Sequence, residues 1–248
     1  MTVTADTAAT AETEESARAA DTAGAARTAA SESLNALFRE LHAQRVKTMD
    51  PETLAININQ RATLVREANV ASFVKPGDVL DPLRLPEVGG TLLDLDALLR
   101  HGPVVLVFFR FEGCPACNLA LPYYQRALLP ALRELGATLV AISPQVPHKL
   151  VAIKRRHDLG YFVASDIGNA LARRLGIVYS FDDASRAAAL ARGTPIGEVT
   201  GTGTWELPMP AALIIGAGRV VHFADVSPDW LRRTEAAVLV EALRRVGK

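Results

Sequence analysis

The chain has 248 residues, of which 49% are apolar, so it is long enough to bury one large core. Its 27 Lys and Arg balance 27 Asp and Glu, which argues against a protein that attracts nucleic acid, an anionic membrane or acidic substrates through its overall field. No run reaches the roughly 18 apolar residues that a membrane-spanning helix needs. The start of the chain lacks the basic and apolar segments of a secretory signal, so we expect a cytosolic location.

The first 73 residues predict a tail followed by a helical extension. Residues 1–30 are rich in Thr, Ala and Glu and contain no large apolar residue after Val3, a composition typical of a disordered tail. Over residues 31–73 we expect two helices that pack as a pair on the main domain or on a second subunit. A homodimer is therefore one of the two arrangements that the sequence allows. The first helix is indicated by apolar residues at the spacing of one helical face, namely Leu34, Leu37, Phe38 and Leu41.

The second helix of this extension has a clear start signal. Asp50 is suited to the N-cap position, and Pro51 is suited to the first helical position. We expect the helix to end near Ala71, with Leu54, Ile58 and Val65 as its buried residues.

Residues 74–248 predict one α/β domain with a mixed central sheet. The apolar run 103–109 is typical of a strand buried on both faces, and it is followed by a helix from about Asn118 to Gly136 and by a parallel strand at 137–142. The remaining expected strands are 83–88, 92–95, 161–164, 211–215 and 219–223; the remaining helices are 95–100, 147–157, 168–175, 183–192 and 230–246; and 193–204 is expected to be a loop.

The sequence Cys114-Pro115-Ala116-Cys117 carries the clearest chemical signal. Its two cysteines are the only ones in the chain, and they lie between the predicted strand 103–109 and the helix that follows it. The start of a helix offers free backbone N–H groups and partial positive charge, which both favour a thiolate, the nucleophilic form of cysteine. The motif therefore predicts redox chemistry that cycles a Cys114–Cys117 disulfide.

Other uses of a single CxxC are less well supported. A structural zinc site needs four ligands, whereas this chain has one cysteine pair and no closely spaced histidine pair to complete the set, so no metal is expected. A purely structural disulfide is a poor alternative, because closing so short a loop removes little unfolded-state entropy. No P-loop and no GxGxxG after a strand is present, so we expect no nucleotide or flavin cofactor.

From about residue 74 to 246 the chain resembles the thioredoxin-fold, peroxiredoxin-like proteins of the AhpC/TSA (redoxin) group. The resemblance covers about two-thirds of the chain, and many such proteins also carry an N-terminal helical extension. The stretches that carry it are Gly102–Arg110, Cys114–Leu119, Leu139–Gln145, Ser165–Asp166, Gly168–Asn169 and Leu207–Ala211.

This resemblance implies that Cys117 aligns with the peroxide-attacking cysteine of the group. The group's supporting Pro and Thr/Ser positions are then occupied by Arg110 and Cys114. A later arginine of the group, expected just before the strand at Ala211, is missing, because Pro208, Met209 and Pro210 stand there. In place of the group's usual small-residue turn and Trp, Phe111-Glu112-Gly113 precedes the first cysteine.

Three functions fit the sequence. The leading one, implied by the resemblance, is reduction of hydroperoxides with electrons from thioredoxin or a similar dithiol, in which Cys117 becomes a sulfenic acid and Cys114 condenses with it. The second is a thioredoxin-like protein-disulfide oxidoreductase without peroxidase activity, in which Cys114, exposed at the helix start, attacks first. The third is a redox sensor in which the disulfide changes the surface presented to a partner.

Two further residues are candidates for a supporting role. Pro210 resembles the cis-proline that faces the CxxC in this fold. Arg110 is either a cation that lowers the pKa of a thiolate or a solvated residue at the end of a strand. Solvent-facing or packing roles are expected for Glu112, Trp205 and the five histidines, among them His157.

Overall fold

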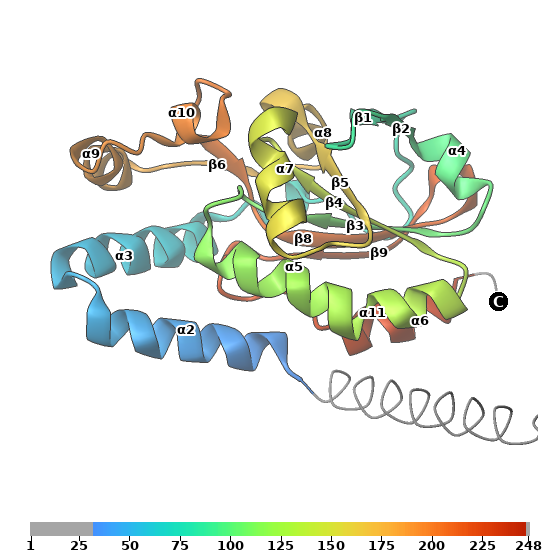
Figure 1. Cartoon of the computed structure of the whole chain (residues 1–248), viewed down its shortest axis with the longest axis horizontal. Helices are drawn as coiled ribbons and strands as arrows, with labels where there is room; N and C mark the ends of the chain where they lie inside the picture. The colour runs from blue at the N-terminus through green and yellow to red at the C-terminus, as the bar shows by residue number, and fades with distance from the viewer. Residues whose placement is uncertain (1–31, 247–248) are drawn as a thin grey trace, which may run out of the picture.

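The computed structural model describes residues 32–246, so the predicted tail at 1–30 lies outside the described residues. Its centre is a five-stranded mixed sheet in the order β5-β4-β3-β8-β9 (Figure 1). β3 runs parallel to β4 and antiparallel to β8, so the predicted parallel pair is confirmed. The strands of this sheet are β3 (Val104–Phe108), β4 (Thr138–Ser143), β5 (Phe162–Ser165), β8 (Ala211–Ile215) and β9 (Val221–Val226).

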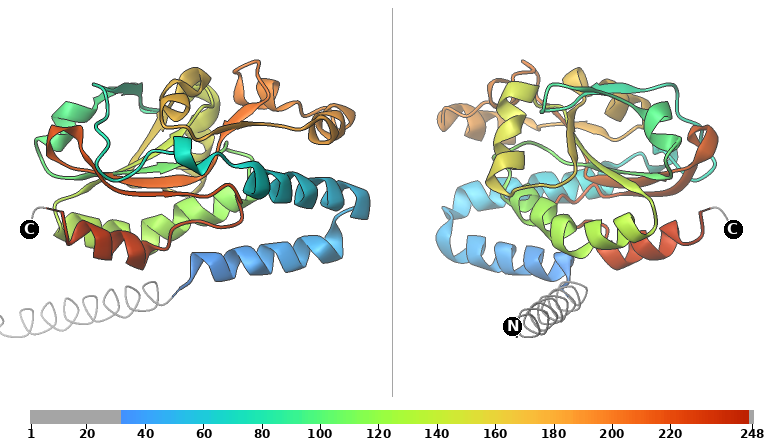
Figure 2. Two further views of the ribbon diagram at one scale, coloured as in Figure 1. Left: turned by 180° about the vertical axis from the view of Figure 1, so that it is seen from behind. Right: turned by 45° about the vertical axis from the view of Figure 1, so that its right-hand side comes forward.

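β3 is the central strand and all five of its residues are buried, as its run of Val, Leu and Phe predicts. Helices cover both faces of the sheet, with α5, α6 and α11 on one side and α7 and α8 on the other (Figures 1 and 2). These helices are α5 (Pro115–Ala127), α6 (Leu129–Glu134), α7 (Pro147–Arg156), α8 (Ala170–Arg174) and α11 (Ala236–Leu243).

Smaller elements surround this core. An antiparallel hairpin, β1 with β2, precedes β3, and a second two-stranded ribbon, β6 with β7, leads into β8. These elements are β1 (Arg84–Pro86), β2 (Leu92–Asp94), β6 (Val178–Ser180), β7 (Glu206–Pro208), α4 (Leu95–Leu99), α9 (Asp183–Ala191), α10 (Ile196–Thr200) and the 3-10 turns η1 (Val70–Ser72), η2 (Ile167–Asn169) and η3 (Ala217–Arg219).

The N-terminal extension is the helical pair α2 (Leu34–Thr48) and α3 (Pro51–Glu67). The Ser33 side chain caps α2, and Asp50 caps α3 as predicted. α2 lies along α5, and α3 reaches α9, so the pair packs against two separate parts of the main domain (Figures 1 and 2). The boundary predicted between residues 73 and 74 stays a prediction.

Several predicted elements differ from the structure. Ile58 and Val65, expected to be buried, are 38% and 56% exposed, because only one narrow face of α3 meets the domain. The predicted helix 118–136 begins earlier, at Pro115, and divides at Leu128. Pro130 explains the division, because it lacks the N–H that would continue the ladder of α5. In addition, α10 lies within the predicted loop 193–204, and the ribbon β6–β7 was not predicted.

The predicted helix 230–246 is helical only from Ala236. Residues 230–235 are instead held by side chains from other elements: Asn35 bonds both the N–H and the C=O of Arg233, at 3.1 and 2.9 Å, and the Tyr124 hydroxyl donates to the C=O of Thr234 at 2.8 Å. These bonds replace the intrahelical ones, so tertiary contacts override the local helix pattern. No helix within 32–246 is long and apolar enough to cross a membrane.

Glu235 connects the extension to the domain. Its carboxylate accepts hydrogen bonds from the N–H groups of Leu34 and Asn35, at 2.8 and 3.0 Å, and from the hydroxyls of Ser33 and Tyr123, at 2.8 and 3.0 Å. It therefore satisfies the free N–H groups at the start of α2. Burial raises the pKa of Glu235, but the hydrogen bonds from the backbone and from Ser33 outweigh burial and hold the pKa below its ordinary value.

We expect Glu235→Gln to lower the free energy of unfolding at pH 7 by about 1–3 kcal/mol, because it weakens a set of charge-assisted hydrogen bonds. Since the folded-state pKa of Glu235 is lowered, its contribution is complete above the unfolded value and is lost as the pH falls through the folded value. Urea unfolding at pH 7 and at pH 3 should therefore show the wild-type advantage shrinking at low pH. Glu241→Gln, which breaks an exposed pair with Arg245, serves as the control, and equal losses in both variants would contradict the prediction.

Candidate active site

The two cysteines lie at the start of α5, directly after the turn that follows β3. Cys114 is the N-cap residue, and Cys117 lies in the first turn, where its N–H donates to the C=O of Cys114 at 3.0 Å. Both thiols are free and buried, with Cys114 1% and Cys117 0% exposed. The expectation that Cys114 is exposed is therefore wrong. The helical period explains the burial of Cys117, because it places this residue with Ala120, Leu121 and Tyr124 on the face of α5 that packs on the domain.

Arg233 is the cation nearest to Cys117. Its Nη2 lies 3.2 Å from the sulfur of Cys117. The side chain is 6% exposed, and its guanidinium lies 5.6 Å from the centre of the Phe38 ring of α2. No carboxylate of residues 32–246 forms an ion pair with Arg233. The sulfur of Cys117 is therefore the group placed to compensate this buried charge.

Arg110 lies on the other side of the motif. Its Nη1 is 4.0 Å from the sulfur of Cys114, and its guanidinium stacks 4.3 Å from the centre of the Trp230 ring and 5.9 Å from that of Phe181. The residue is 7% exposed, so the alternative of a solvated strand-end residue is wrong. Its contribution to the chemistry stays a prediction.

The two thiols differ sharply in their tendency to ionise. Burial raises the pKa of both. For Cys114, the hydrogen bond that it donates to Cys117 and the nearby negative charge raise the pKa further, well above the ordinary value. For Cys117, the hydrogen bond from Cys114, the charge of Arg233 and the N–H of Arg110 outweigh burial and hold the pKa well below the ordinary value. These opposite shifts favour the thiolate form at Cys117 over the thiolate form at Cys114.

Hydrogen bonds fix the turn that precedes the cysteines. Asn118 donates to the C=O groups of Glu112 and Cys114, at 2.6 and 3.0 Å, and the side chain of Gln145 accepts from the N–H of Glu112 at 2.8 Å. Glu112 forms an ion pair with Arg156 and is only half-buried, in line with a structural rather than a proton-shuttling role. His157 is half-buried and bonds Asn118 at 2.8 Å, so it lies next to the motif and has a packing role.

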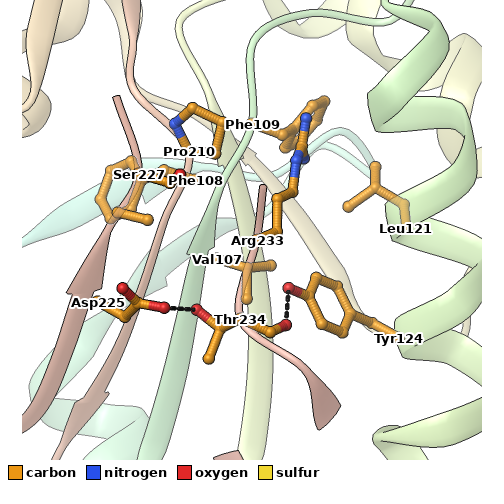
Figure 3. Close-up of a pocket in the computed structure, with 11 residues that line it drawn as sticks. Val107, Phe108, Phe109, Leu121, Tyr124, Pro210, Asp225, Ser227, Arg233 and Thr234 are labelled. Carbon is orange, nitrogen blue, oxygen red and sulfur yellow. Dashed lines mark hydrogen bonds between the residues drawn. The ribbon is translucent and has the colours of Figure 1, made fainter. Parts of the chain in front are cut away.

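Pro210 directly precedes β8. The peptide bond before Pro210 is trans, as are all peptide bonds of residues 32–246. The predicted cis-proline is therefore wrong. Pro210 lines a cavity of about 10 Å³ together with Phe109 and Arg233 (Figure 3). On the far side of this cavity, Thr234 bonds Asp225 and Tyr124 (Figure 3). A supporting role for Pro210 stays a prediction.

Comparison with known proteins places this site in a family. The AhpC/TSA family matches residues 76–224. The chain belongs to the AhpC/TSA family. A Mycobacterium tuberculosis protein named "Putative peroxiredoxin" is 30% identical over 104 residues, which are 42% of this chain and 67% of that protein. Membership of this family confirms the predicted resemblance. It also confirms the predicted function, so the protein is an enzyme, a thiol-dependent peroxidase.

Solved structures confirm the thioredoxin-like fold. Peroxidoxin BcpB from Mycobacterium tuberculosis aligns with a TM-score of 0.55 and 22% identity, over 71% of this chain and 99% of that one. Reduced Prx3 from Vibrio vulnificus, solved with hydrogen peroxide, aligns with a TM-score of 0.55 and 18% identity, over 69% of this chain and 99% of that one.

Sequence reasoning missed two residues of the site. Arg233 lies after β9, in the segment 230–246 that the sequence predicts to be a helix. Tyr179 lies on the unpredicted strand β6 and stacks on Trp230, with ring centres 6.1 Å apart. No local signal marks either residue, because both reach the cysteines through tertiary packing.

We expect Arg233→Gln to raise the pKa of Cys117, because it removes the cation at 3.2 Å while keeping a polar side chain. Titration of thiolate absorbance in the ultraviolet should show one thiolate in the wild type that forms at a lower pH than an ordinary thiol, a shift to higher pH in Arg233→Gln, and its loss in Cys117→Ser. Arg232→Gln is the matched control, since Arg232 is exposed and adjacent in sequence. An unchanged titration in Arg233→Gln would contradict the assigned role of this arginine.

Proposed function

We propose that Cys117 is the thiolate that attacks the hydroperoxide and that Cys114 resolves the product as an intramolecular disulfide. The contact of 3.2 Å between Arg233 and the sulfur of Cys117 carries this proposal. A buried thiolate needs a compensating cation. Among the described residues, Arg233 lies 3.2 Å from the sulfur of Cys117, whereas Arg110 lies 4.0 Å from the sulfur of Cys114. The opposite pKa shifts of the two thiols support the same order of attack.

In the first step the Cys117 thiolate attacks one oxygen of the peroxide. An S–O bond forms and the O–O bond breaks, so that the sulfur is oxidised to a sulfenic acid. The leaving oxygen takes a proton and departs as water or an alcohol. Breaking the O–O bond places negative charge on the leaving oxygen, and hydrogen-bond donors held in a dry site stabilise such charge.

The site contains buried donors without protein acceptors. The Nε groups of Arg110 and Arg233 make no hydrogen bond to any described residue, and the hydroxyl of Tyr179 lies beside the charge of Arg110 with its own proton free to donate. Burial raises the pKa of Tyr179 to about 12, so its hydroxyl stays protonated at neutral pH. These groups suit oxygen atoms that arrive with the substrate. In this role Arg233 replaces the arginine that the sequence lacks before β8.

In the second step Cys114 attacks the sulfur of the Cys117 sulfenic acid. The Cys114 proton and the sulfenic hydroxyl leave together as water, and the S–S bond forms. An external reductant then restores both thiols; thioredoxin or a similar dithiol is the proposed electron donor. A cytosolic location and a homodimer likewise stay predictions.

The alternative of a disulfide oxidoreductase needs Cys114 as the first nucleophile. The raised pKa of Cys114 opposes that assignment in the reduced protein, because the thiolate is the nucleophile. A redox sensor uses the same two oxidation states, and slow turnover with a change of conformation would distinguish it from a peroxidase.

Stopped-flow mixing of the reduced protein with hydrogen peroxide tests the order of attack. We expect a fast phase in the wild type and in Cys114→Ser, and its loss in Cys117→Ser. In Cys114→Ser the product should be a stable sulfenic acid that dimedone traps, because no resolving thiol remains. A wild-type rate no faster than that of a free thiolate, or loss of the fast phase only in Cys114→Ser, would overturn the proposed function.

A further inference from the structure

A groove of about 510 Å³ lies beside the active-site helix. Its walls come from α2 and α3 of the extension on one side and from the α9–α10 region on the other. Its floor includes Cys114, Pro115 and Ala116. This volume is typical of a site for a small organic molecule. Apolar side chains form much of the wall, among them Met49, Ile56, Phe181, Ile196, Trp230 and Leu231.

The charged side chains that line the groove are all basic. They are Arg45, Arg110 and Arg192, and no Asp or Glu among residues 32–246 lines it. Burial and the like charges of Arg61 and Arg110 lower the pKa of Arg45, and Cys114 opposes them. Arg45 bonds only the neutral groups of Asn57 and Met49 within the described residues. The groove is therefore complementary to an anion.

Gln60 of α3 gives an independent sign of a missing ligand. This residue lines the groove and is 3% exposed, and its Nε2 has no hydrogen-bond partner among the described residues. A buried amide without a partner costs about 1–3 kcal/mol. A ligand with an acceptor oxygen would remove that cost.

Only one of the two cysteines is among the residues that line the groove. Cys114 lines it, whereas Cys117 does not. A molecule in the groove therefore meets Cys114, the resolving cysteine of the proposed function, and not the peroxide-attacking thiolate. The step in which an outside molecule reacts at Cys114 is reduction of the disulfide.

We propose that the groove binds a low-molecular-weight thiol that carries a carboxylate, and that this thiol reduces the Cys114–Cys117 disulfide directly, as a route additional to a protein dithiol. The proposal rests on the proposed function for the order of attack. Arg45 and Arg192 attract the carboxylate, Gln60 donates a hydrogen bond to it or to a neighbouring carbonyl, and the apolar walls hold the carbon chain.

The chemistry favours attack at Cys114. The thiolate of the ligand forms a bond to the sulfur of Cys114, and the Cys114–Cys117 bond breaks with Cys117 leaving as a thiolate. Arg233 stabilises that leaving group, and a leaving thiol of low pKa departs faster. A second ligand thiolate then attacks the mixed disulfide, which releases Cys114 and the oxidised ligand as its disulfide.

The test compares glutathione with its diethyl ester, which has the same thiol without the carboxylates. The protein is first converted to the Cys114–Cys117 disulfide with diamide, and its reduction is followed by tryptophan fluorescence, to which Trp205 and Trp230 both contribute. Per thiolate present, glutathione should react about 10-fold faster than the ester in the wild type. Arg45→Gln and Arg192→Gln should each reduce this preference to below about 3-fold, whereas Gln60→Leu should raise the half-saturating concentration of glutathione.

Arg39→Gln is the matched control, since Arg39 lies on α2, is exposed and does not line the groove. It should keep the wild-type preference. Fragment-ion mass spectrometry of the trapped intermediate should place the glutathionyl group on Cys114. Equal rates for glutathione and its ester, an equal loss in Arg39→Gln, or a glutathionyl group on Cys117 would overturn the proposal.

The oxidation of the reduced wild type by hydrogen peroxide, measured separately, distinguishes failure of this proposal from failure of the proposed function. Absence of fast peroxide oxidation in the wild type would contradict the peroxidase assignment. Reduction of the disulfide formed with diamide would still test binding in the groove.

Discussion

The contact between the guanidinium of Arg233 and the sulfur of Cys117 is the interaction on which the site depends. Both groups are almost completely buried, so each would leave an uncompensated charge without the other. A thiol buried in this way would ordinarily remain protonated and inert. The hydrogen bond from Cys114 and the charge of Arg233 reverse that tendency for Cys117, whereas burial and the neighbouring Cys117 raise the pKa of Cys114. These contacts shift the pKa values of the two thiols in opposite directions.

The helical extension is part of this arrangement. Asn35 of α2 holds both backbone groups of Arg233, and the ring of Phe38 lies against its guanidinium. Glu235, two residues further on, caps α2 in return. The extension and the 230–235 segment therefore fix each other, and the position of Arg233 follows from their packing. The same extension supplies one wall of the groove that leads to Cys114.

The sequence predicts the sheet and the motif well, because these features have local signals. The buried run before the CxxC forms β3, and Asp50-Pro51 begins α3, since strand burial and helix capping are encoded within a few residues. It does not predict the cation of the site. Arg233 lies 116 residues from Cys117, in a segment whose apolar spacing indicates a helix. The segment is not helical there, because the side chain of Asn35 bonds the backbone of Arg233. The trans bond of Pro210 and the burial of Cys114 are likewise consequences of packing.

The central claim is that Arg233 keeps Cys117 ionised, and the pH dependence of peroxide oxidation tests it most directly. The measurement uses Cys114→Ser, so that a single thiol reports, with and without Arg233→Gln. With Arg233 present, the rate constant should stay level from pH 8 down to a midpoint well below that of an ordinary thiol. The added Arg233→Gln change should move this midpoint upward. A midpoint near that of a free cysteine, or one that Arg233→Gln does not move, would contradict the account.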